Sequence, residues 1–459
     1  MNERSIWCGK ALLEDGWHEQ TILSLDESGR ITGLTAGPSG SADERLRGVV
    51  IPGMPNLHCH SFQYLMAGLT GAKGAHDDSF WSWRKAMYRL AGQVTPDQIE
   101  ACAGWLYLEM LRKGYTACAE FHYLHHDPQA NPYANPAETG ARVVAAADVC
   151  GLGLTLLPVL YCRSGFGADG PEPEQRRFIH TPESFAALVD ACRDMLGGRP
   201  LFNLGLAPHS LRAVSRRELL WLLETCWQPG MPFHIHIAEQ RSEVEQCVHH
   251  LGARPIAWLL EHCPVDPHWC LVHATHSTRE ELAGMAERGA VAGLCPTTEA
   301  DLGDGFFEAK VWQGLGGSFG IGSDSNVRVS PTEELRMLEY GARLRGGSRN
   351  VLADHDRSCG RLLYESACVG GGVALGQPVG KIAPGYRADL VVLDDEHPML
   401  QGVPGDAVLD SYVFAGTEDM IRSVHVAGRE VLDRGRHRQE DHLQRRFLKV
   451  ARECRTLAG

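Results

Sequence analysis

No run of about 18 uncharged apolar residues, the length of a membrane-spanning helix, occurs in this chain of 459 residues. The nearest candidate, residues 143–161, contains Asp148, Gly151 and Gly153. We interpret it as a helix end that leads into a strand. The N-terminus also lacks the apolar core of a signal peptide. We therefore expect a cytoplasmic protein with no membrane partner.

An excess of positive charge is also missing. The chain has 44 Lys and Arg against 57 Asp and Glu, a formal net charge of −13. This balance disfavours nucleic acid and anionic membrane surfaces as partners. The 15 cysteines contain no C-x-x-C pair, and several lie within apolar runs, among them Cys118, Cys270 and Cys295. We predict reduced, buried cysteines rather than disulfides.

The order of apolar runs predicts two kinds of domain. Residues 1–50 and 376–435 hold short strand-like runs between glycine turns, which predicts a composite β-sandwich domain formed by both termini. Residues 51–375 alternate β-rich runs with helical patterns, as is typical of a parallel sheet with crossover helices. Eight strands are expected, at 49–60, 115–121, 152–160, 201–207, 232–237, 269–273, 290–294 and 318–321. The fold class predicted is α/β, a (β/α)₈ TIM-type barrel with a small β domain.

The end of the chain, residues 436–459, is predicted to be a helix. One apolar stripe with 4-3-4-3 spacing runs along it, formed by Leu443, Phe447, Val450, Cys454 and Leu457. Two interpretations remain open for this stripe, packing on the barrel or a subunit contact. We also expect a homodimer.

Histidines on alternate positions are the strongest chemical signal. His58 and His60 follow the first expected barrel strand, and residues i and i+2 of a strand point to the same face. Two neutral imidazoles suit zinc or another first-row divalent metal. Further titratable side chains follow later strands: His209, His236, Glu239, His273 and Asp324. Because the C-terminal ends of barrel strands form one face, we predict that these residues build a metal site.

The order of these residues resembles the amidohydrolase superfamily, whose pattern is H-x-H, then H-x-x-E, then His, then Asp. The H-x-x-E element formed by His236 and Glu239 resembles the deaminase branch of that superfamily, which uses one metal ion. No lysine suited to bridging two metals is evident. His234 is an alternative ligand, but we prefer His236 because it sets the three-residue spacing to Glu239.

The resemblance implies one Zn²⁺ per chain, or another divalent transition metal, held by His58, His60, His236 and Asp324. Bound metal lowers the pKa of water toward neutrality. Asp324 would accept the proton of the attacking water, and Glu239 would pass a proton to the leaving nitrogen. His273 would hydrogen-bond the water or stabilise the developing tetrahedral centre.

Arginines in the expected loops indicate an anionic substrate. Arg84 lies in the long segment after the first strand, and Arg212 follows the fourth. Arginine binds carboxylates in bidentate geometry, so the pair suggests a dicarboxylate or an amino-acid carboxylate. Ordinary surface ion pairs are the alternative for each arginine. Tyr123 and the imidazoles of residues 122, 125 and 126 follow the second strand.

Local sequences narrow the resemblance. Those at 56–63, 78–84, 119–123, 209–214 and 235–240 resemble the formimidoylglutamate deiminase family. This resemblance implies hydrolysis of the small molecule N-formimino-L-glutamate to N-formyl-L-glutamate and ammonia in histidine degradation. The substrate contacts implied by position are Gln63, Arg84, Tyr123, His209 and Arg212. Cys59, where relatives often carry Ser, is expected to point away from the metal.

Two alternatives remain at this stage. Another mononuclear zinc deaminase or chlorohydrolase of the same branch would act on guanine, S-adenosylhomocysteine or a chloro-triazine. A non-catalytic scaffold on the same fold is the more remote alternative, because every residue of the expected metal site is present.

Overall fold

Both ends of the chain enter one mixed seven-stranded sheet in this computed structural model, which describes residues 4–71, 79–168 and 170–458, with side chains to Arg455. The strand order is β16-β15-β14-β4-β1-β2-β3. The strands are β1 (Arg4–Leu13), β2 (Gly16–Leu25), β3 (Ile31–Ala36), β4 (Glu44–Pro52), β14 (Leu390–Leu393), β15 (Ile421–Val426) and β16 (Arg429–Asp433). Antiparallel pairing of β4 with β14 joins the two ends, and the sheet has a small apolar core of its own.

The middle of the chain forms the parallel barrel. Its strands are β5 (Met54–Cys59), β6 (Tyr115–His122), β7 (Gly153–Leu160), β8 (Phe202–Leu204), β9 (Ala207–Pro208), β10 (Phe233–Ile237), β11 (Trp269–His273), β12 (Val291–Leu294) and β13 (Ser318–Ile321). Backbone hydrogen bonds from Leu206 N to Pro232 O (2.9 Å) and from His234 N to Leu206 O (3.0 Å) close the ring. The predicted α/β barrel with an added β domain is confirmed.

Two of the eight expected strands are interrupted. The run 49–60 is divided at Gly53, where the chain passes from β4 in the terminal sheet to β5 in the barrel. A Cβ at Gly53 would lie 2.3 Å from Thr116 Cγ2, so only glycine fits this passage. The run 201–207 is divided into β8 and β9 at Gly205, where a Cβ would lie 2.8 Å from Pro232 O.

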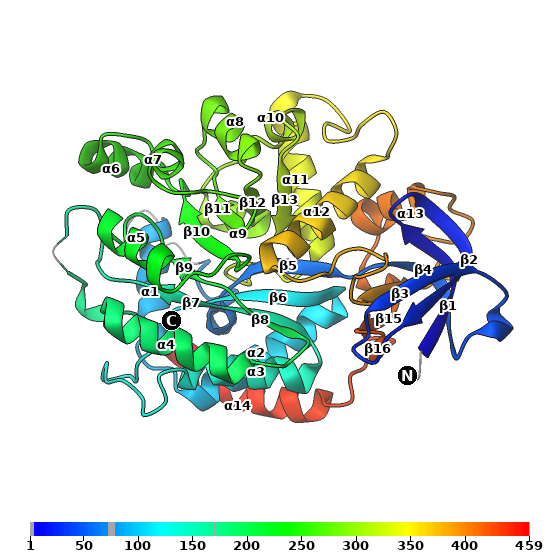
Figure 1. Ribbon diagram of the computed structural model, residues 1–459, viewed down its shortest axis with the longest axis horizontal. Coiled ribbons are helices and arrows are strands. Elements are labelled where there is room, and N and C mark those ends of the chain that lie inside the picture. Colours follow the sequence, from blue (N-terminus) through cyan, green and yellow to red (C-terminus); the bar gives the residue numbers. More distant parts are fainter. Residues whose placement is uncertain (1–3, 72–78, 169, 459) are drawn as a thin grey trace.

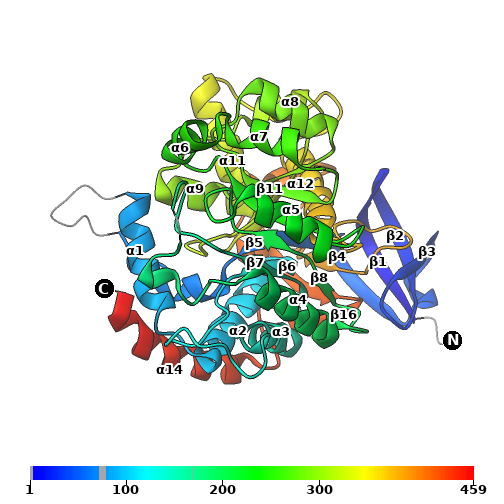
Figure 2. The ribbon, with the colours of Figure 1, turned by 60° about the vertical axis from the view of Figure 1, so that its left-hand side comes forward.

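Helices cover the barrel. They are α1 (Phe80–Ala91), α2 (Pro96–Arg112), α3 (Glu138–Cys150), α4 (Pro182–Leu196), α5 (Arg216–Thr225), α6 (Arg241–Leu251), α7 (Pro255–His262), α8 (Arg279–Glu287), α9 (Pro296–Leu302), α10 (Ala309–Gly314), α11 (Pro331–Gly346), α12 (Cys359–Leu375), α13 (Ala407–Asp410) and α14 (Glu440–Ala458). Short 3₁₀ turns occur at Ser39–Ser41, Ser61–Met66, Pro173–Gln175 and Glu418–Met420, and a π turn at Ser411–Ala415. The sheet of both termini lies at one end of the molecule and α1 at the other (Figures 1 and 2).

The C-terminal helix packs on the barrel. Leu443, Phe447, Val450 and Cys454 of α14 are buried, and α14 contacts α2 and α1. A Cβ at Gly104 of α2 would lie 2.9 Å from Leu443 Cδ2, so the glycine allows the close approach of these helices. Of the two interpretations of the apolar stripe, the structure therefore shows packing on the barrel. The side chain of Leu457 lies outside the described residues, as does Asp78 of the segment 78–84.

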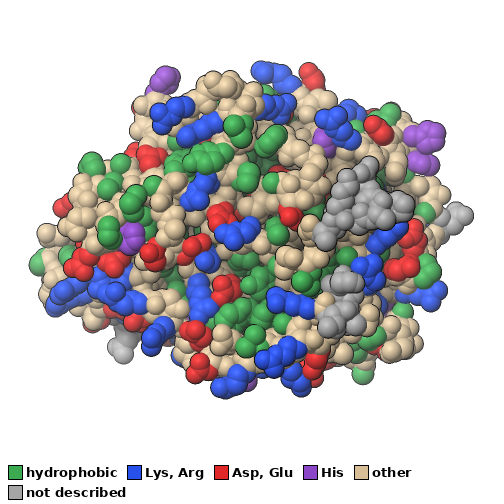
Figure 3. Space-filling view, turned by 180° about the vertical axis from the view of Figure 1, so that it is seen from behind, with side chains coloured by type: hydrophobic (Ala, Val, Ile, Leu, Met, Phe, Trp, Pro, Cys, Tyr) green, Lys and Arg blue, Asp and Glu red, His purple; other side chains and the backbone are tan. Residues whose placement is uncertain are grey.

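The cysteines and the surface agree with the composition. All 15 cysteines are free, and all are buried except the half-buried Cys162. Within the described residues, no helix has the length and apolar character to cross a membrane. Acidic and basic side chains are intermixed over the face opposite to that of Figure 1 (Figure 3).

Candidate active site

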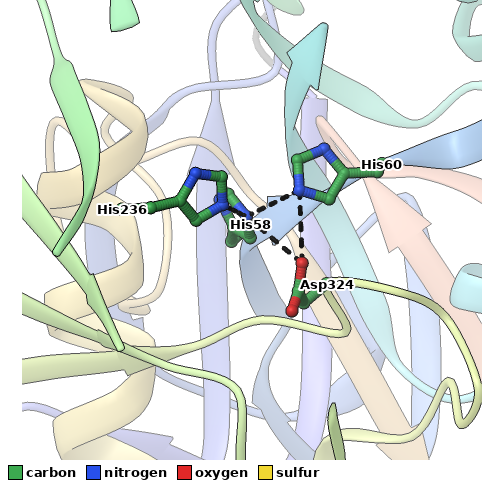
Figure 4. A group of neighbouring side chains, drawn as sticks. All are labelled: His58, His60, His236 and Asp324. Carbon is green, nitrogen blue, oxygen red and sulfur yellow. Dashed lines mark hydrogen bonds and ion pairs between the residues drawn. The ribbon is translucent and has the colours of Figure 1, made fainter. Parts of the chain in front are cut away.

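Four side chains at the C-terminal ends of barrel strands point to one centre. His58 is near the end of β5, His60 follows it, His236 lies on β10, and Asp324 follows β13 (Figure 4). His58 Nε2 lies 3.1 Å from His60 Nε2 and 2.9 Å from His236 Nε2. Asp324 Oδ1 lies 3.4 Å from His58 Nε2 and 3.2 Å from His60 Nε2. All four ligand atoms lie within 4.8 Å of one another, close enough to bind one ion.

The outer ring nitrogens show that this centre fits a cation. His60 Nδ1 donates to Phe121 O at 2.9 Å, and His236 Nδ1 donates to His209 O at 3.1 Å. When neutral, both rings therefore direct a bare Nε2 lone pair toward the centre. A hydrogen on His58 Nε2 could satisfy only one of its neighbours. Three imidazoles and one carboxylate around one point are the donor set of a zinc-type site.

Burial keeps these ligands in the protonation states that a metal requires. It lowers the pKa of His58 to about 3, despite the opposing effect of Asp324. It also lowers the pKa of His236 well below its ordinary value. For Asp324, burial raises the pKa, but hydrogen bonds to His58 and His60 outweigh it and hold the pKa well below the ordinary value. Neutral imidazoles beside an ionised carboxylate are suited to metal coordination.

Buried amides and hydroxyls hold β5 and the end of β13 together. Asn56 Nδ2 donates to Ser323 Oγ at 2.7 Å, and Asn56 Oδ1 accepts from Ser323 N at 3.1 Å. Asn326 Nδ2 donates to His60 O at 2.9 Å. The backbone of Asp324 bonds to both histidine segments, through His58 O at 3.0 Å and His60 N at 3.1 Å. These contacts fix the backbone positions from which His58, His60 and Asp324 extend into the centre.

Strained backbone concentrates at this face of the barrel. Ala238, His273, Ala274, Asp324 and Asn326 have positive φ values between 44° and 70° without being glycine. Such conformations are costly for residues with a Cβ and persist where surrounding contacts enforce them. The sharp turns after β10, β11 and β13 thus aim these side chains into the barrel mouth.

A second group of ionisable side chains lies beside the four-residue centre. His273 Nε2 is 3.8 Å from Glu239 Oε1 and 3.9 Å from Asp324 Oδ2. Its Nδ1 lies 3.3 Å from Oε1 of Glu299, which also accepts from Cys295 N at 3.0 Å. Burial by itself would lower the pKa of His273, but Glu239 and the other two carboxylates outweigh it and raise that pKa to about 10. The imidazole lies among the carboxyl groups of Glu239, Glu299 and Asp324, which favour its protonated form.

Glu239 has the environment of a proton carrier. Burial raises the pKa of its carboxyl group, with His273 and Arg212 opposing the shift. Its position is fixed by Glu243 at the start of α6, which accepts from Glu239 N at 3.0 Å and from Ala238 N at 3.3 Å. A carboxyl group with a raised pKa exchanges protons nearer to neutral pH than an exposed one.

One cavity joins this chemistry to the predicted substrate contacts. It spans about 550 Å³, including space open to solvent, and is lined by His60, His236, Glu239, His273 and Asp324. The same cavity is lined by all five predicted contacts, Gln63, Arg84, Tyr123, His209 and Arg212. A larger hollow between the terminal sheet and the opposite end of the barrel is lined by none of these residues.

The cavity holds two positive side chains. Arg212 is only 6% exposed and makes no hydrogen bond or ion pair with any described residue. Arg84 of α1 lies over the rings of Trp81 and Tyr88, at 4.5 and 5.3 Å from their centres. A buried guanidinium without a direct partner is costly unless an anion pairs with it. In the same cavity, the amide of Gln63 donates to Tyr123 OH at 2.8 Å.

Other polar residues named in the sequence have structural partners instead. His234 Nε2 donates to Ala374 O at 2.7 Å, away from the four-residue centre. His122 bonds to Thr139 Oγ1 at 2.9 Å, and His125 and His126 donate to backbone carbonyls at 3.1 and 2.8 Å. The thiol of Cys59 lies 3.5 Å from Asn326 Oδ1, so it points away from the centre as expected.

Sequence reasoning missed several residues of this site. Glu299 follows β12, the seventh barrel strand, and its place at a strand end was the available signal. Glu243 is four residues after Glu239, in the first turn of α6. Tyr88 and Tyr161 line the cavity, and Gln175 bonds to both, but no spacing pattern connects these three positions.

Comparison with known proteins agrees with this geometry. Residues 49–431 match the amidohydrolase family. The chain is 48% identical over 98% of its length to the formimidoylglutamate deiminase of Pseudomonas aeruginosa, of which it covers 99%. The crystal structure of an amidohydrolase from Brucella melitensis superposes with a TM-score of 0.94 at 48% identity, over 98% of this chain and 99% of that one. An adenosine deaminase from Xanthomonas campestris with bound zinc shares the fold, with a TM-score of 0.81 at 22% identity over 99% of each chain.

Proposed function

The chain belongs to the amidohydrolase family, and we propose that it hydrolyses N-formimino-L-glutamate to N-formyl-L-glutamate and ammonia, a step of histidine degradation. It is a hydrolase that acts on a carbon–nitrogen bond of a linear amidine, in agreement with its relative from Pseudomonas aeruginosa, which is named formimidoylglutamate deiminase. The observation that carries this assignment is the shared cavity. Arg84 and the buried Arg212, which has no direct partner among the described residues, line the same cavity as His60, His236 and Asp324 of the four-residue centre.

The proposed centre binds one zinc ion per chain through His58, His60, His236 and Asp324, with another divalent transition metal as the alternative. When bound, such an ion acts as a Lewis acid and lowers the pKa of water toward neutrality. The converging Nε2 lone pairs and the ionised Asp324 support this ligand set. Because His60, His236 and Asp324 also line the cavity, an ion held there would be accessible to a small ligand from the cavity side.

The proton transfers are assigned to three side chains of the cavity. Asp324 accepts the proton of the attacking water, because its carboxylate is ionised and lies at the centre of the site. Glu239 carries a proton to the departing nitrogen, for which its raised pKa is suited. His273, held by Glu299, presents Nε2 between these two carboxylates and stabilises charge on the tetrahedral carbon centre.

Substrate selection is assigned to the positive side of the cavity. Arg84 and Arg212 each pair with one carboxylate of the glutamate portion, and a guanidinium binds a carboxylate with two parallel hydrogen bonds. Gln63, Tyr123 and His209 provide further polar contacts. A purine or triazine would leave the buried charge of Arg212 unpaired, which disfavours those substrates. We further propose a cytoplasmic homodimer.

Ammonia release provides the test of this function. The purified protein should release ammonia from N-formimino-L-glutamate with a kcat/KM at least about a hundredfold above that for guanine, which has no carboxylate, because each unpaired buried charge costs a few kcal/mol. Metal analysis of the same preparation should give close to one divalent ion per chain. A purine that outcompetes N-formimino-L-glutamate would refute the substrate, and two ions at full occupancy would refute the mononuclear centre.

A further inference from the structure

Gln175, in the segment that follows β7, has a side-chain amide of fixed orientation. The residue has 0% exposure, and its Oε1 accepts from the backbone N–H of Glu172 at 2.9 Å. A backbone N–H can only donate, so this contact identifies which end of the amide is oxygen. The Nε2 group therefore faces the opposite side, where it lies 3.0 Å from Tyr88 OH and 3.0 Å from Tyr161 OH.

This orientation decides where the phenol hydrogens go. Each phenol oxygen accepts a hydrogen of the Gln175 amide, so each hydroxyl must direct its own hydrogen elsewhere. Within the described chain, neither hydroxyl donates to a carbonyl, carboxylate or side-chain amide. Tyr88 and Tyr161 can share at most one hydrogen between them. At least one phenol hydrogen is therefore available to a group inside the cavity that both rings line.

The surroundings of these hydroxyls favour an anion. Tyr88 and Tyr161 are 6% and 3% exposed, so water competes little for their hydrogens. Arg84 lies 5.3 Å from the centre of the Tyr88 ring, and Arg212 lines the same cavity. Burial raises the pKa of Tyr161 far above its ordinary value, so it remains a neutral donor. A carboxylate is the group that accepts from guanidinium and hydroxyl donors together.

Arg177, two residues after Gln175, fixes this arrangement in advance. It is 2% exposed, and its guanidinium donates to Ala91 O at the end of α1 and to His126 O. Its own carbonyl accepts from His125 N at 3.0 Å and from His126 N at 3.1 Å. The segments after β5, β6 and β7 are thus bonded together. Donors held in place before binding lose little conformational freedom when a ligand arrives.

We propose that Tyr88 and Tyr161 bind a carboxylate group of the substrate, and that Gln175 is the positioning residue that directs their hydrogens into the cavity. The identity of that substrate as a glutamate derivative rests on the proposed function. The phenols add neutral donors beside Arg84 and Arg212. They would help the cavity to prefer dicarboxylates over neutral amidines.

Gln175→Glu is the sharpest test because it reverses the two hydrogen bonds to the phenols with almost no change of shape. One carboxylate oxygen still accepts from Glu172 N, whereas the other accepts from the phenols instead of donating to them. The phenol hydrogens then turn away from the cavity. We expect KM for N-formimino-L-glutamate to rise about tenfold or more, with kcat changed less than about threefold. The double variant Tyr88→Phe, Tyr161→Phe should show the same rise.

Binding of glutarate, measured by calorimetry on the metal-loaded protein, provides a readout that needs no turnover. Its affinity should fall about tenfold or more in each of these variants, since a hydrogen bond to a charged group is lost. Formamidine, which has no carboxylate, should be hydrolysed equally by parent and variants. Tyr115→Phe is the matched control, because Tyr115 has a buried hydroxyl without a hydrogen-bond partner and lies outside the cavity.

Each outcome separates the inference from the function on which it rests. Unchanged KM and unchanged glutarate affinity in the variants would overturn the inference, as would a parent protein that binds no glutarate. Equal losses on formamidine would show a merely structural effect and also overturn it. If glutarate binding depends on the tyrosines but N-formimino-L-glutamate releases no ammonia, the carboxylate subsite stands and the proposed function fails.

Discussion

Replacing Glu239 by Gln separates proton transfer from binding of metal and substrate. The carboxyl group lines the cavity at 3.8 Å from His273 Nε2 and does not belong to the four-residue centre. Its backbone N–H is fixed by Glu243 at 3.0 Å, which the substitution leaves in place. A carboxamide has nearly the same shape but cannot carry a proton. The substitution therefore tests the chemical role alone.

The expected effect follows from the size of acid–base catalysis. A positioned acid or base contributes about 10²–10⁴ in rate, which corresponds to about 2.7–5.5 kcal/mol of activation free energy. Burial raises the pKa of Glu239, so the protonated acid persists to a higher pH than in an exposed glutamate. The parent should therefore lose kcat on the alkaline side as pH rises through that pKa. The Gln variant should lack this limb.

Steady-state ammonia release and metal analysis on one preparation provide the assay. We expect kcat to fall by about 10²–10⁴ while KM changes less than about threefold, with close to one metal ion retained per chain. Loss of the metal in the Gln variant would show that Glu239 is a ligand. A kcat within about threefold of the parent would show that another group carries the proton, and either result would refute the reasoning.

Three further predictions address other parts of the site and the core. Arg212→Met should lower kcat/KM at least about tenfold, largely through KM, because a charge-assisted bond of about 1.5–3 kcal/mol is lost; unchanged kinetics would remove Arg212 from the substrate contacts. Glu299→Ala should lower kcat about tenfold with metal retained, whereas Glu299→Gln, which keeps an acceptor for His273, should lower it less. The loss should vanish in a His273→Ala background, and additive losses would contradict the positioning role. Burial lowers the pKa of His180 to about 3, so below its unfolded pKa the unfolded chain binds the proton and the folded chain does not. This group should therefore remove about 2 kcal/mol of stability between pH 7 and pH 5; His180→Asn should reduce that loss in urea unfolding, and an unchanged pH dependence would contradict it.

Local sequence was sufficient for most elements of the fold. The buried strands of the barrel read as short β-rich runs between helical patterns, because a strand covered on both faces has little polar alternation. Helix starts were also encoded locally. At the start of α2, the side chains of Thr95 and Gln98 form the reciprocal cap that their three-residue spacing predicts. The errors fell at Gly53 and Gly205, where neighbours from other strands decide that the chain must bend.

The candidate site was also predicted in part from the sequence and in part decided by the tertiary structure. The ends of the expected barrel strands indicated a group of titratable residues that must meet at one face, and the resemblance to the amidohydrolase superfamily selected His58, His60, His236 and Asp324 from that group. His234 and His236 lie two residues apart and face the same side of β10, so the choice between them depended on which is nearer the C-terminal end of the strand. In the structure, His236 reaches the four-residue centre, whereas His234 donates to the carbonyl of Ala374 on α12.

Partners distant in sequence were decided by tertiary structure alone. Glu299, after β12, reaches His273 at the end of the neighbouring strand β11. Gln175 meets Tyr88 only because the segments after β5 and β7 lie together, and it meets Tyr161 because the segment after β7 folds back on itself. The sequence by itself determined the residue types, the strand order and the metal-ligand spacing. The tertiary structure determined the protonation states and the hydrogen-bond partners of these side chains. Both depend on which neighbouring groups exclude water from a side chain.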